Sequence, residues 1–254
     1  IIPIRLDSII RLENVLLTID NLLSNFETNI FLLEAAPYCN NLLKNMFRKG
    51  EINYTFIEDN DPVFYKTKYL NIMARQVSTK NVGIWDADVI INPVQIVEAV
   101  SLLRENMFDI VYPYDGAFLD TSEILRAYYL IHKDIHFLMK NREKMKSLYS
   151  IKNVIGALGG GILAKTEKYI SAGGENELFY GWGLEDGERH HRWSGFGYKI
   201  HRINGPMFHL THPRDLNGKM RSIYHFGKAS SDWSETVHST IDELRRYYSN
   251  LYNH

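Results

Sequence analysis

Residues 82–88, Val82-Gly83-Ile84-Trp85-Asp86-Ala87-Asp88, place an apolar run directly before two carboxylates. The run is short and continuous, which predicts a buried strand that ends at Trp85. A helix is expected over residues 93–103, because Pro93 suits a first helical turn. A further strand is predicted at residues 109–112. The segment therefore indicates a strand–helix–strand unit of an α/β protein, with the acidic triplet at a strand end.

The same alternation extends towards the amino terminus. Strands are predicted at residues 1–5, 29–33 and 53–57, and a helical pattern follows each of them. The first helix has Ser8 as its cap, the second (residues 40–49) closes at Gly50, and the third covers residues 64–77. Such alternation predicts a Rossmann-like, mostly parallel central sheet with helices on both faces. Ligands of these sheets bind beyond the carboxyl ends of the strands, where residues 86–88 stand.

The second half of the chain does not continue the strand–helix alternation. Residues 121–146 form a long helical pattern, for which a lid, an insertion and an oligomer contact all remain open. Residues 154–212 are rich in glycine, with a strand at 199–203, and an amphipathic tail helix is expected at 234–250. The length suits one α/β domain. We expect a nucleotide-binding half (1–112), a helical insertion or lid (113–150), an acceptor half (151–214) and a helical tail (215–254).

Composition narrows the class of protein. The 254 residues carry 29 basic and 30 acidic side chains, a net charge of −1, so no basic track for nucleic acid is expected. No apolar run approaches the roughly 18 residues of a membrane span, and the first residues do not resemble a secretion signal. Cys39 is the single cysteine, which excludes an internal disulfide. We expect a soluble, cytoplasmic protein for which peripheral membrane association stays open.

Three groups of residues could carry chemistry. Asp86 and Asp88 after a strand suit a divalent metal, although a solvated strand end or a β-turn fits equally well. Glu185 and Asp186 follow a Gly-Trp-Gly-Leu string at a predicted helix start, where they could also merely complement the helix dipole. His209 and His212 follow a predicted strand and offer nitrogen ligands.

The order of these motifs resembles that of GT-A glycosyltransferases of the β-1,4-galactosyltransferase and chondroitin-polymerase-like family. The resemblance spans most of residues 1–214. Its carriers, in chain order, are Ile2-Pro3-Ile4-Arg5, the helix Phe64-Tyr65-Lys66-Thr67-Lys68-Tyr69-Leu70-Asn71, Asp86-Ala87-Asp88, Gly159-Gly160-Gly161, Gly181-Trp182-Gly183-Leu184-Glu185-Asp186, and the late histidines. The chain departs from the family pattern at Lys66 (in place of Arg), Leu184 (Gly) and Gly187 (an acid).

The resemblance implies a UDP-sugar donor, a glycan acceptor and Mn²⁺ or Mg²⁺. Asp88 and His209 would bind the metal, with Asp86 and His212 as further possible ligands. The implied donor contacts come from residues spread along the chain: Pro3, Arg5, Phe64, Lys66, Asp86, Gly160, Gly161 and Trp182. Asp186 would act as the catalytic base, and Glu185 would orient sugar hydroxyls.

These roles predict an inverting transfer of a hexose or N-acetylhexosamine, with galactose or N-acetylgalactosamine favoured, in the synthesis of a surface polysaccharide. Two alternatives stay open. One is a retaining α-glycosyltransferase of the same fold, and the other is a non-catalytic protein that binds a nucleotide sugar. A metal-dependent nuclease is disfavoured by the absence of a basic excess.

Overall fold

The first half of the chain builds a parallel sheet. The computed structural model describes residues 1–148, 156–181, 183–213 and 223–251. Strands β1 (Ile2–Ile4), β2 (Phe31–Ala36) and β3 (Asn53–Glu58) pair in parallel in the order β1-β2-β3. Residues in β1 and nearly all in β2 are buried. That burial on both faces explains why these strands appear in the sequence as continuous apolar runs.

Two backbone hydrogen bonds link β1 to β4 (Asn81–Trp85). The Ile1 nitrogen donates to the Gly83 carbonyl at 2.7 Å, and the Trp85 nitrogen donates to the Ile1 carbonyl at 3.1 Å, which is a parallel pattern. Beyond β4 come β9 (Gly161–Lys165), β6 (Ile110–Tyr112) and β10 (Ile200–Arg202), in the order β10-β6-β9-β4. β9 runs antiparallel to both of its neighbours, whereas β6 and β10 are parallel.

A smaller sheet lies beside the ends of these strands. Its order is β5-β11-β7-β8, formed by β5 (Val89–Ile91), β11 (Met207–His209), β7 (Phe118–Asp120) and β8 (Lys146–Ser147). β11 pairs antiparallel with β5 and parallel with β7. None of these strands, nor β9, was predicted from the sequence.

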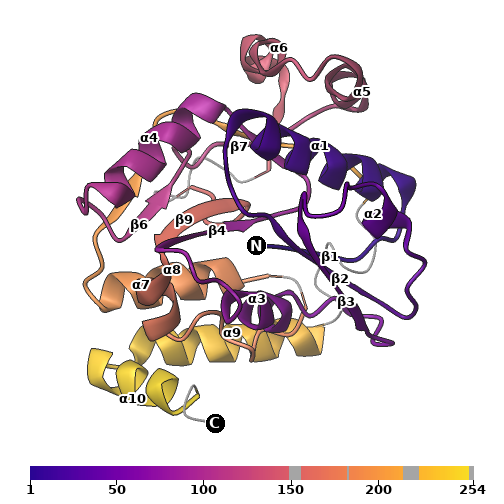
Figure 1. The fold of residues 1–254 in the computed structure, drawn as a ribbon. Helices are drawn as coiled ribbons and strands as arrows, with labels where there is room; N and C mark the ends of the chain where they lie inside the picture. Colours follow the sequence, from indigo (N-terminus) through magenta and orange to yellow (C-terminus); the bar gives the residue numbers. More distant parts are fainter. Residues whose placement is uncertain (149–155, 182, 214–222, 252–254) are drawn as a thin grey trace.

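Helices cover both faces of the main sheet (Figure 1). α1 (Ile9–Asn25) and α4 (Pro93–Arg104) lie above it in that view, and α3 (Lys66–Ala74), α7 (Thr166–Ser171) and α8 (Glu185–Gly195) lie below. As predicted, Ser8 caps α1, because its hydroxyl accepts a hydrogen bond from the Arg11 nitrogen at 3.3 Å. One large cluster of buried apolar side chains draws on strands and helices from both halves of the chain. The predicted single-domain α/β architecture is therefore confirmed.

Three predicted helices differ in extent. The segment expected at 40–49 contains only the single turn α2 (Leu42–Asn45), and the third helix is shortened to α3. The long pattern at 121–146 divides into α5 (Glu123–His132), α6 (Ile135–Lys140), a 3₁₀ turn (Arg142–Lys144) and β8. α5 ends because Lys133 adopts a left-handed conformation, with φ of 51°. Arg126 attaches α5 to α1 through hydrogen bonds to Asn14 (2.8 Å) and Glu13 (2.6 Å).

The tail forms two helices, α9 (Ile223–His238) and α10 (Ile241–Leu251), so the prediction of one helix at 234–250 was wrong. The reason is a capping box at the break. The Thr240 nitrogen donates to the Glu243 carboxylate at 2.8 Å, and the Glu243 nitrogen donates to the Thr240 hydroxyl at 3.3 Å. This reciprocal pair starts a new helix. α10 packs on the body through Tyr248, which is buried.

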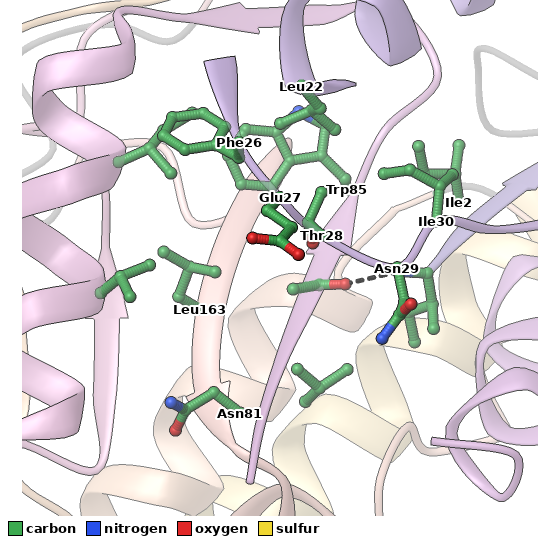
Figure 2. A pocket seen from close by; sticks show the side chains of 15 residues that line it. Ile2, Leu22, Phe26, Glu27, Thr28, Asn29, Ile30, Asn81, Trp85 and Leu163 are labelled. Carbon is green, nitrogen blue, oxygen red and sulfur yellow. Dashed lines mark hydrogen bonds between the residues drawn. The ribbon is translucent and has the colours of Figure 1, made fainter. Parts of the chain in front are cut away.

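An apolar cavity of about 230 Å³ lies near the amino ends of β1 and β4 (Figure 2). Ile2, Leu22, Phe26, Trp85 and Leu163 are among its lining residues. The acidic triplet at residues 86–88 is not among the lining residues. Within the described ranges, no helix combines the length and hydropathy needed to cross a membrane.

Candidate active site

Three potential metal ligands converge at the edge of the small sheet. Asp88 precedes β5 and His209 ends β11, and the antiparallel register sets His209 opposite Val89. The Asp88 carboxylate lies 3.6 Å from Nε2 of His209 and 3.0 Å from Nε2 of His212. Ligand atoms of the three residues all lie within 4.8 Å of one another. The structure thus brings both histidines to Asp88, where sequence reasoning favoured one.

Asp120 supports this cluster from the neighbouring strand. Its carboxylate lies 2.8 Å from Nδ1 of His209, which leaves Nε2 facing Asp88. A carboxylate on the second ring nitrogen is the usual support for a metal-binding imidazole. Burial alone would lower the pKa of His209, but Asp88 and Asp120 raise it to about 9. Burial opposes the charge on Asp88, yet the two histidines hold its pKa well below the ordinary value.

Asp86 points to a different partner. Its carboxylate forms an ion pair with the Lys66 ammonium at 2.7 Å and takes no part in the three-residue cluster found among the described residues. Lys66 starts α3 and also lies 3.9 Å from Glu185. Burial opposes the charge on Lys66, but Asp86, Asp186 and Glu185 hold its pKa well above the usual value. Lys66 therefore links the acidic triplet to the carboxylates of α8.

Glu185 and Asp186 open α8, as the sequence predicted. The residue before them, Leu184, has φ of 69°, a left-handed conformation that a glycine would adopt without strain. The Glu185 carboxylate turns back to accept a hydrogen bond from the Gly183 nitrogen at 2.9 Å. Both acids thus stand at the positive end of the helix dipole.

The two carboxyl groups differ in charge state. Burial raises the pKa of Glu185 to about 7, and the adjacent negative charge of Asp186 adds to this effect. Burial also opposes ionisation of Asp186, but the cations of Lys66 and Arg189 outweigh it and lower the pKa. Asp186 is therefore the stronger acid and stays ionised at neutral pH, with 23% of its side chain exposed.

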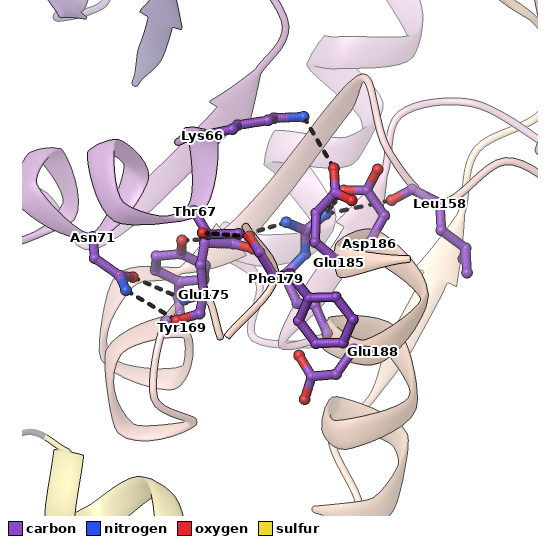
Figure 3. A network of polar contacts seen from close by, with 12 residues as sticks. Lys66, Thr67, Asn71, Leu158, Tyr169, Glu175, Phe179, Glu185, Asp186 and Glu188 are labelled. Carbon is purple, nitrogen blue, oxygen red and sulfur yellow. Dashed lines mark hydrogen bonds and ion pairs between the residues drawn. The ribbon is translucent and has the colours of Figure 1, made fainter. Parts of the chain in front are cut away.

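A buried network stands behind Asp186 (Figure 3). Arg189, which is 1% exposed, donates to Oδ1 of Asp186 at 2.7 Å and to the Glu175 carboxylate at 2.6 Å. Tyr169 donates to the same Glu175 oxygen at 2.9 Å. The main chain of Glu175 makes two hydrogen bonds with the Asn71 side chain, of 2.8 and 2.9 Å. Sequence reasoning assigned no role to the partners that surround Asp186 in this network.

The glycine turn lies against both acidic motifs. The Asp86 nitrogen donates to the Gly160 carbonyl at 2.7 Å, which fixes the turn beside the end of β4. A methyl group on Gly159 would overlap Oδ2 of Asp186, and one on Gly160 (φ +86°) would overlap Met207. Gly161 starts β9 and packs against Trp85. Glycine is thus required at these positions because neighbouring side chains approach the backbone too closely for a Cβ atom.

Residues predicted to touch the nucleotide line the ends of β1 and α3. Pro3 is buried within β1, and Phe64 lies 5.8 Å from the Arg5 guanidinium. Arg5 uses three of its five N–H groups on the protein, at the carbonyls of Ala35 (2.9 Å) and Asp61 (2.6 Å) and the carboxylate of Asp59 (2.9 Å). The structure therefore shows Arg5 holding the loop after β3. Trp182, predicted to face a sugar, lies outside the described residues.

Only part of what was missed had a signal in the sequence. Arg189 follows Asp186 by three positions in a predicted helix, and side chains at that spacing are neighbours. Asp120 and Glu175 gave no such indication, because each reaches the site from a distant part of the chain. Tyr114, whose hydroxyl contacts the carbonyls of Ala157 (2.9 Å) and Gly159 (2.6 Å), was equally hidden.

Residues 140–215 match a family model described as the N-terminal domain of galactosyltransferase. The match covers under a third of the chain, but it contains the glycine turn, the two acids of α8 and both histidines. A comparison with curated proteins found no match.

Two solved structures are similar in fold to most of the chain. Both are of glucosyl-3-phosphoglycerate synthase from Mycobacterium tuberculosis. The complex with Mn²⁺, UDP-glucose and phosphoglyceric acid has a TM-score of 0.53 and 15% identity, over 93% of this chain and 77% of that chain. The complex with Mn²⁺, UDP and glucosyl-3-phosphoglycerate has a TM-score of 0.52 and 15% identity, over 93% and 78%. This similarity shows the fold, so the predicted GT-A fold class is confirmed.

Proposed function

We propose that this protein is an inverting, metal-dependent glycosyltransferase. It would move a hexose or N-acetylhexosamine, with galactose or N-acetylgalactosamine favoured, from a UDP-sugar to a glycan hydroxyl. The observation that carries the proposal is the adjacency of two different sites. One is the metal-ligand cluster of Asp88, His209 and His212, and the other is the Glu185–Asp186 pair. Lys66 connects them, because it contacts Glu185 and also Asp86, two positions before Asp88. The galactosyltransferase family match and the GT-A fold support it.

The donor set fits a divalent cation. One carboxylate and two imidazoles converge, and Asp120 already holds His209 with one nitrogen turned towards Asp88. Oxygen and imidazole ligands together suit Mn²⁺ better than Mg²⁺, which prefers oxygen alone. When bound, the ion would neutralise charge on the departing diphosphate. Lys66 would add a point charge beside it, exchanging its ion pair with Asp86 for the donor's phosphates.

Asp186 would serve as the general base. As the acceptor oxygen bonds to the anomeric carbon and the bond to UDP breaks, the acceptor proton would pass to Oδ2 of Asp186. Oδ1 is already occupied by Arg189, whereas Oδ2 lies beside the glycine turn. A lowered pKa keeps the carboxylate ready at neutral pH. Attack opposite the leaving group inverts the anomeric centre, so an α-linked donor gives a β-linked product.

The remaining assignments follow from this mechanism. Glu185, half protonated near pH 7, would hydrogen-bond to sugar hydroxyls as donor or acceptor. Pro3 and Phe64 would frame the uracil, and residues 1–112 would form the nucleotide-binding half, with the acceptor half at 151–214. A net charge of −1 suits a largely uncharged glycan acceptor. We place the reaction on the cytoplasmic side, in the synthesis of a surface polysaccharide.

The test is a panel of UDP-sugars with Mn²⁺, scored by sugar release, transfer to glycan acceptors and NMR of the anomeric linkage. We expect a β-linked product, and a loss of transfer of about 100-fold or more in Asp186→Asn, the typical contribution of a general base. Binding of UDP with Mn²⁺ should be unchanged in that variant. Asp20→Asn, on the outer part of α1 and paired with Lys133, is the control and should transfer normally.

Each alternative has its own result. An α-linked product would identify a retaining transferase. Tight UDP-sugar binding without turnover on any acceptor would favour the non-catalytic binding protein. Parental transfer by Asp186→Asn would show that the base is another residue.

A further inference from the structure

Two arginines on α8 sit one turn apart and are equally buried. Arg189 is 1% exposed and Arg192 is fully buried. Each forms an ion pair with a buried glutamate, Arg189 with Glu175 at 2.6 Å and Arg192 with Glu188 at 2.8 Å. Each glutamate also accepts a tyrosine hydroxyl, at 2.9 Å for Glu175 and 2.8 Å for Glu188. In residue type, burial and tyrosine partner the two pairs are closely matched, although Glu188 lies on α8 itself and Glu175 lies in the segment before that helix.

The pairs differ in what else they touch. The second guanidinium arm of Arg189 donates to Oδ1 of Asp186 at 2.7 Å. Arg192 instead donates to the backbone carbonyls of Ala172 and Gly174 and faces the Tyr248 ring of α10. Only the first pair therefore reaches a carboxylate of the candidate active site.

The Arg189 pair is anchored to the helix that carries Lys66. Asn71 of α3 holds both the backbone nitrogen and the backbone carbonyl of Glu175. A continuous chain of contacts therefore runs from α3 through Glu175 and Arg189 to Asp186 (Figure 3). It fixes the carboxylate of Asp186 relative to the start of α3, where Lys66 stands.

We propose that Arg189 is a positioning residue that holds Oδ1 of Asp186 so that Oδ2 alone is presented to the acceptor hydroxyl beside Gly159. This inference rests on the proposed function for Asp186 as base. One arm of the guanidinium is held by Glu175 and the other donates a charge-assisted hydrogen bond to Oδ1 of Asp186, so rotation of this carboxylate would break that bond and move Oδ2. A base misplaced by about 1 Å can lower a rate by about 100-fold.

The test compares two double variants that each remove one buried pair. Glu175→Gln/Arg189→Met removes the pair that reaches Asp186, and Glu188→Gln/Arg192→Met removes the matched pair that does not. Removing both charges avoids leaving one of them buried and unpartnered, which would favour unfolding. Arg189→Lys, which retains the charge but not the fork, is the third variant. Unfolding temperatures are measured for all three with the wild type.

We expect Glu175→Gln/Arg189→Met to lose about 100-fold in kcat with little change in donor KM, and Arg189→Lys to fall between it and the wild type. Glu188→Gln/Arg192→Met should keep kcat within about threefold of the wild-type value, although its unfolding temperature should be similar to that of the other double variant. The positioning role is overturned if both double variants lose kcat equally, or if neither does.

A second readout separates this inference from the proposed function. Carboxyl ¹³C NMR, with the Asp186 signal assigned by its loss in Asp186→Asn, follows ionisation of that side chain without turnover. Its midpoint should rise in Glu175→Gln/Arg189→Met and stay fixed in Glu188→Gln/Arg192→Met. An unmoved midpoint in the first variant would contradict the contact. If the wild type transfers no sugar while this midpoint moves, the transferase function fails and the Arg189 contact stands.

Discussion

Glu185 is a carboxyl group whose burial disfavours its ionised form. It is 6% exposed and next to the ionised Asp186, and its pKa is raised to about 7. Between the unfolded pKa of 4.5 and pH 7, the folded protein holds a proton that the unfolded chain releases. Stability therefore decreases as the pH rises through this window, and the deficit persists above pH 7.

Glu185→Gln should relieve that deficit. We expect the substitution to raise the free energy of unfolding by about 3 kcal/mol at pH 8 and to change it much less at pH 5, where the carboxyl group of the folded protein is already neutral. Thermal unfolding at the two pH values measures this. Glu58→Gln, at the exposed end of β3, is the control and should show no such contrast. An equal gain at both pH values would mean that ionisation of Glu185 is not the cause.

Among the elements, α10 packs against α8 through the buried side chain of Tyr248. The Tyr248 ring packs against Gly173 and its hydroxyl donates to the buried Glu188 carboxylate at 2.8 Å. Tyr248→Phe removes one donor from a buried charge, so we expect a loss of about 2 kcal/mol in unfolding free energy. Tyr247→Phe, on the exposed side of the same helix, should lose little. Urea unfolding of both variants decides this, and similar losses would contradict the role of the Glu188 contact.

The sequence predicted elements well where periodicity was long. α1 and α4 have caps and apolar positions over three or more turns, and both were placed within a residue or two. Breaks inside long helical patterns were missed, because Lys133 ends α5 in a left-handed conformation without glycine. Thr240 and Glu243 did carry a capping-box signal at the tail break, but the flanking helical pattern outweighed it.

The sequence predicted which residues belong to the candidate site, but it did not predict which of them contact one another. Asp86 was grouped with Asp88 because the two are only two positions apart in the chain, yet the structure pairs Asp86 with Lys66 and Asp88 with the histidines. Those pairings depend on the register of β5 with β11 and on the placement of α3. Register follows from packing of the whole sheet, so a local pattern cannot reveal it.

For the whole molecule, a bound metal should contribute to stability. The cluster joins Asp88, before β5, to the two histidines of the distant carboxyl-terminal half. An ion that binds only the folded state stabilises it by about 2.7 kcal/mol at 100 times its Kd. Because two ligands are imidazoles, we expect Mn²⁺ to raise the unfolding temperature at far lower concentration than Mg²⁺.

Thermal unfolding across a titration of each ion measures this preference. The variant His209→Ala/His212→Ala should lose the response to Mn²⁺, whereas His238→Ala, on the exposed end of α9, should keep it. Equal responses to Mn²⁺ and Mg²⁺ would indicate that the histidines do not bind the ion.

The contacts that complete the site also have a kinetic consequence. Asn71 meets Glu175 across 104 residues of chain, and Thr67 donates to the Phe179 carbonyl across 112. Contacts between such distant segments form slowly, because a long loop must close before any of them is made. The ligand cluster exists only after residues 156–213 have packed against the first half of the chain, because His209 and His212 lie in that segment. A metal ion should therefore act late in folding, slowing unfolding of the finished protein and leaving the rate of its assembly largely unchanged.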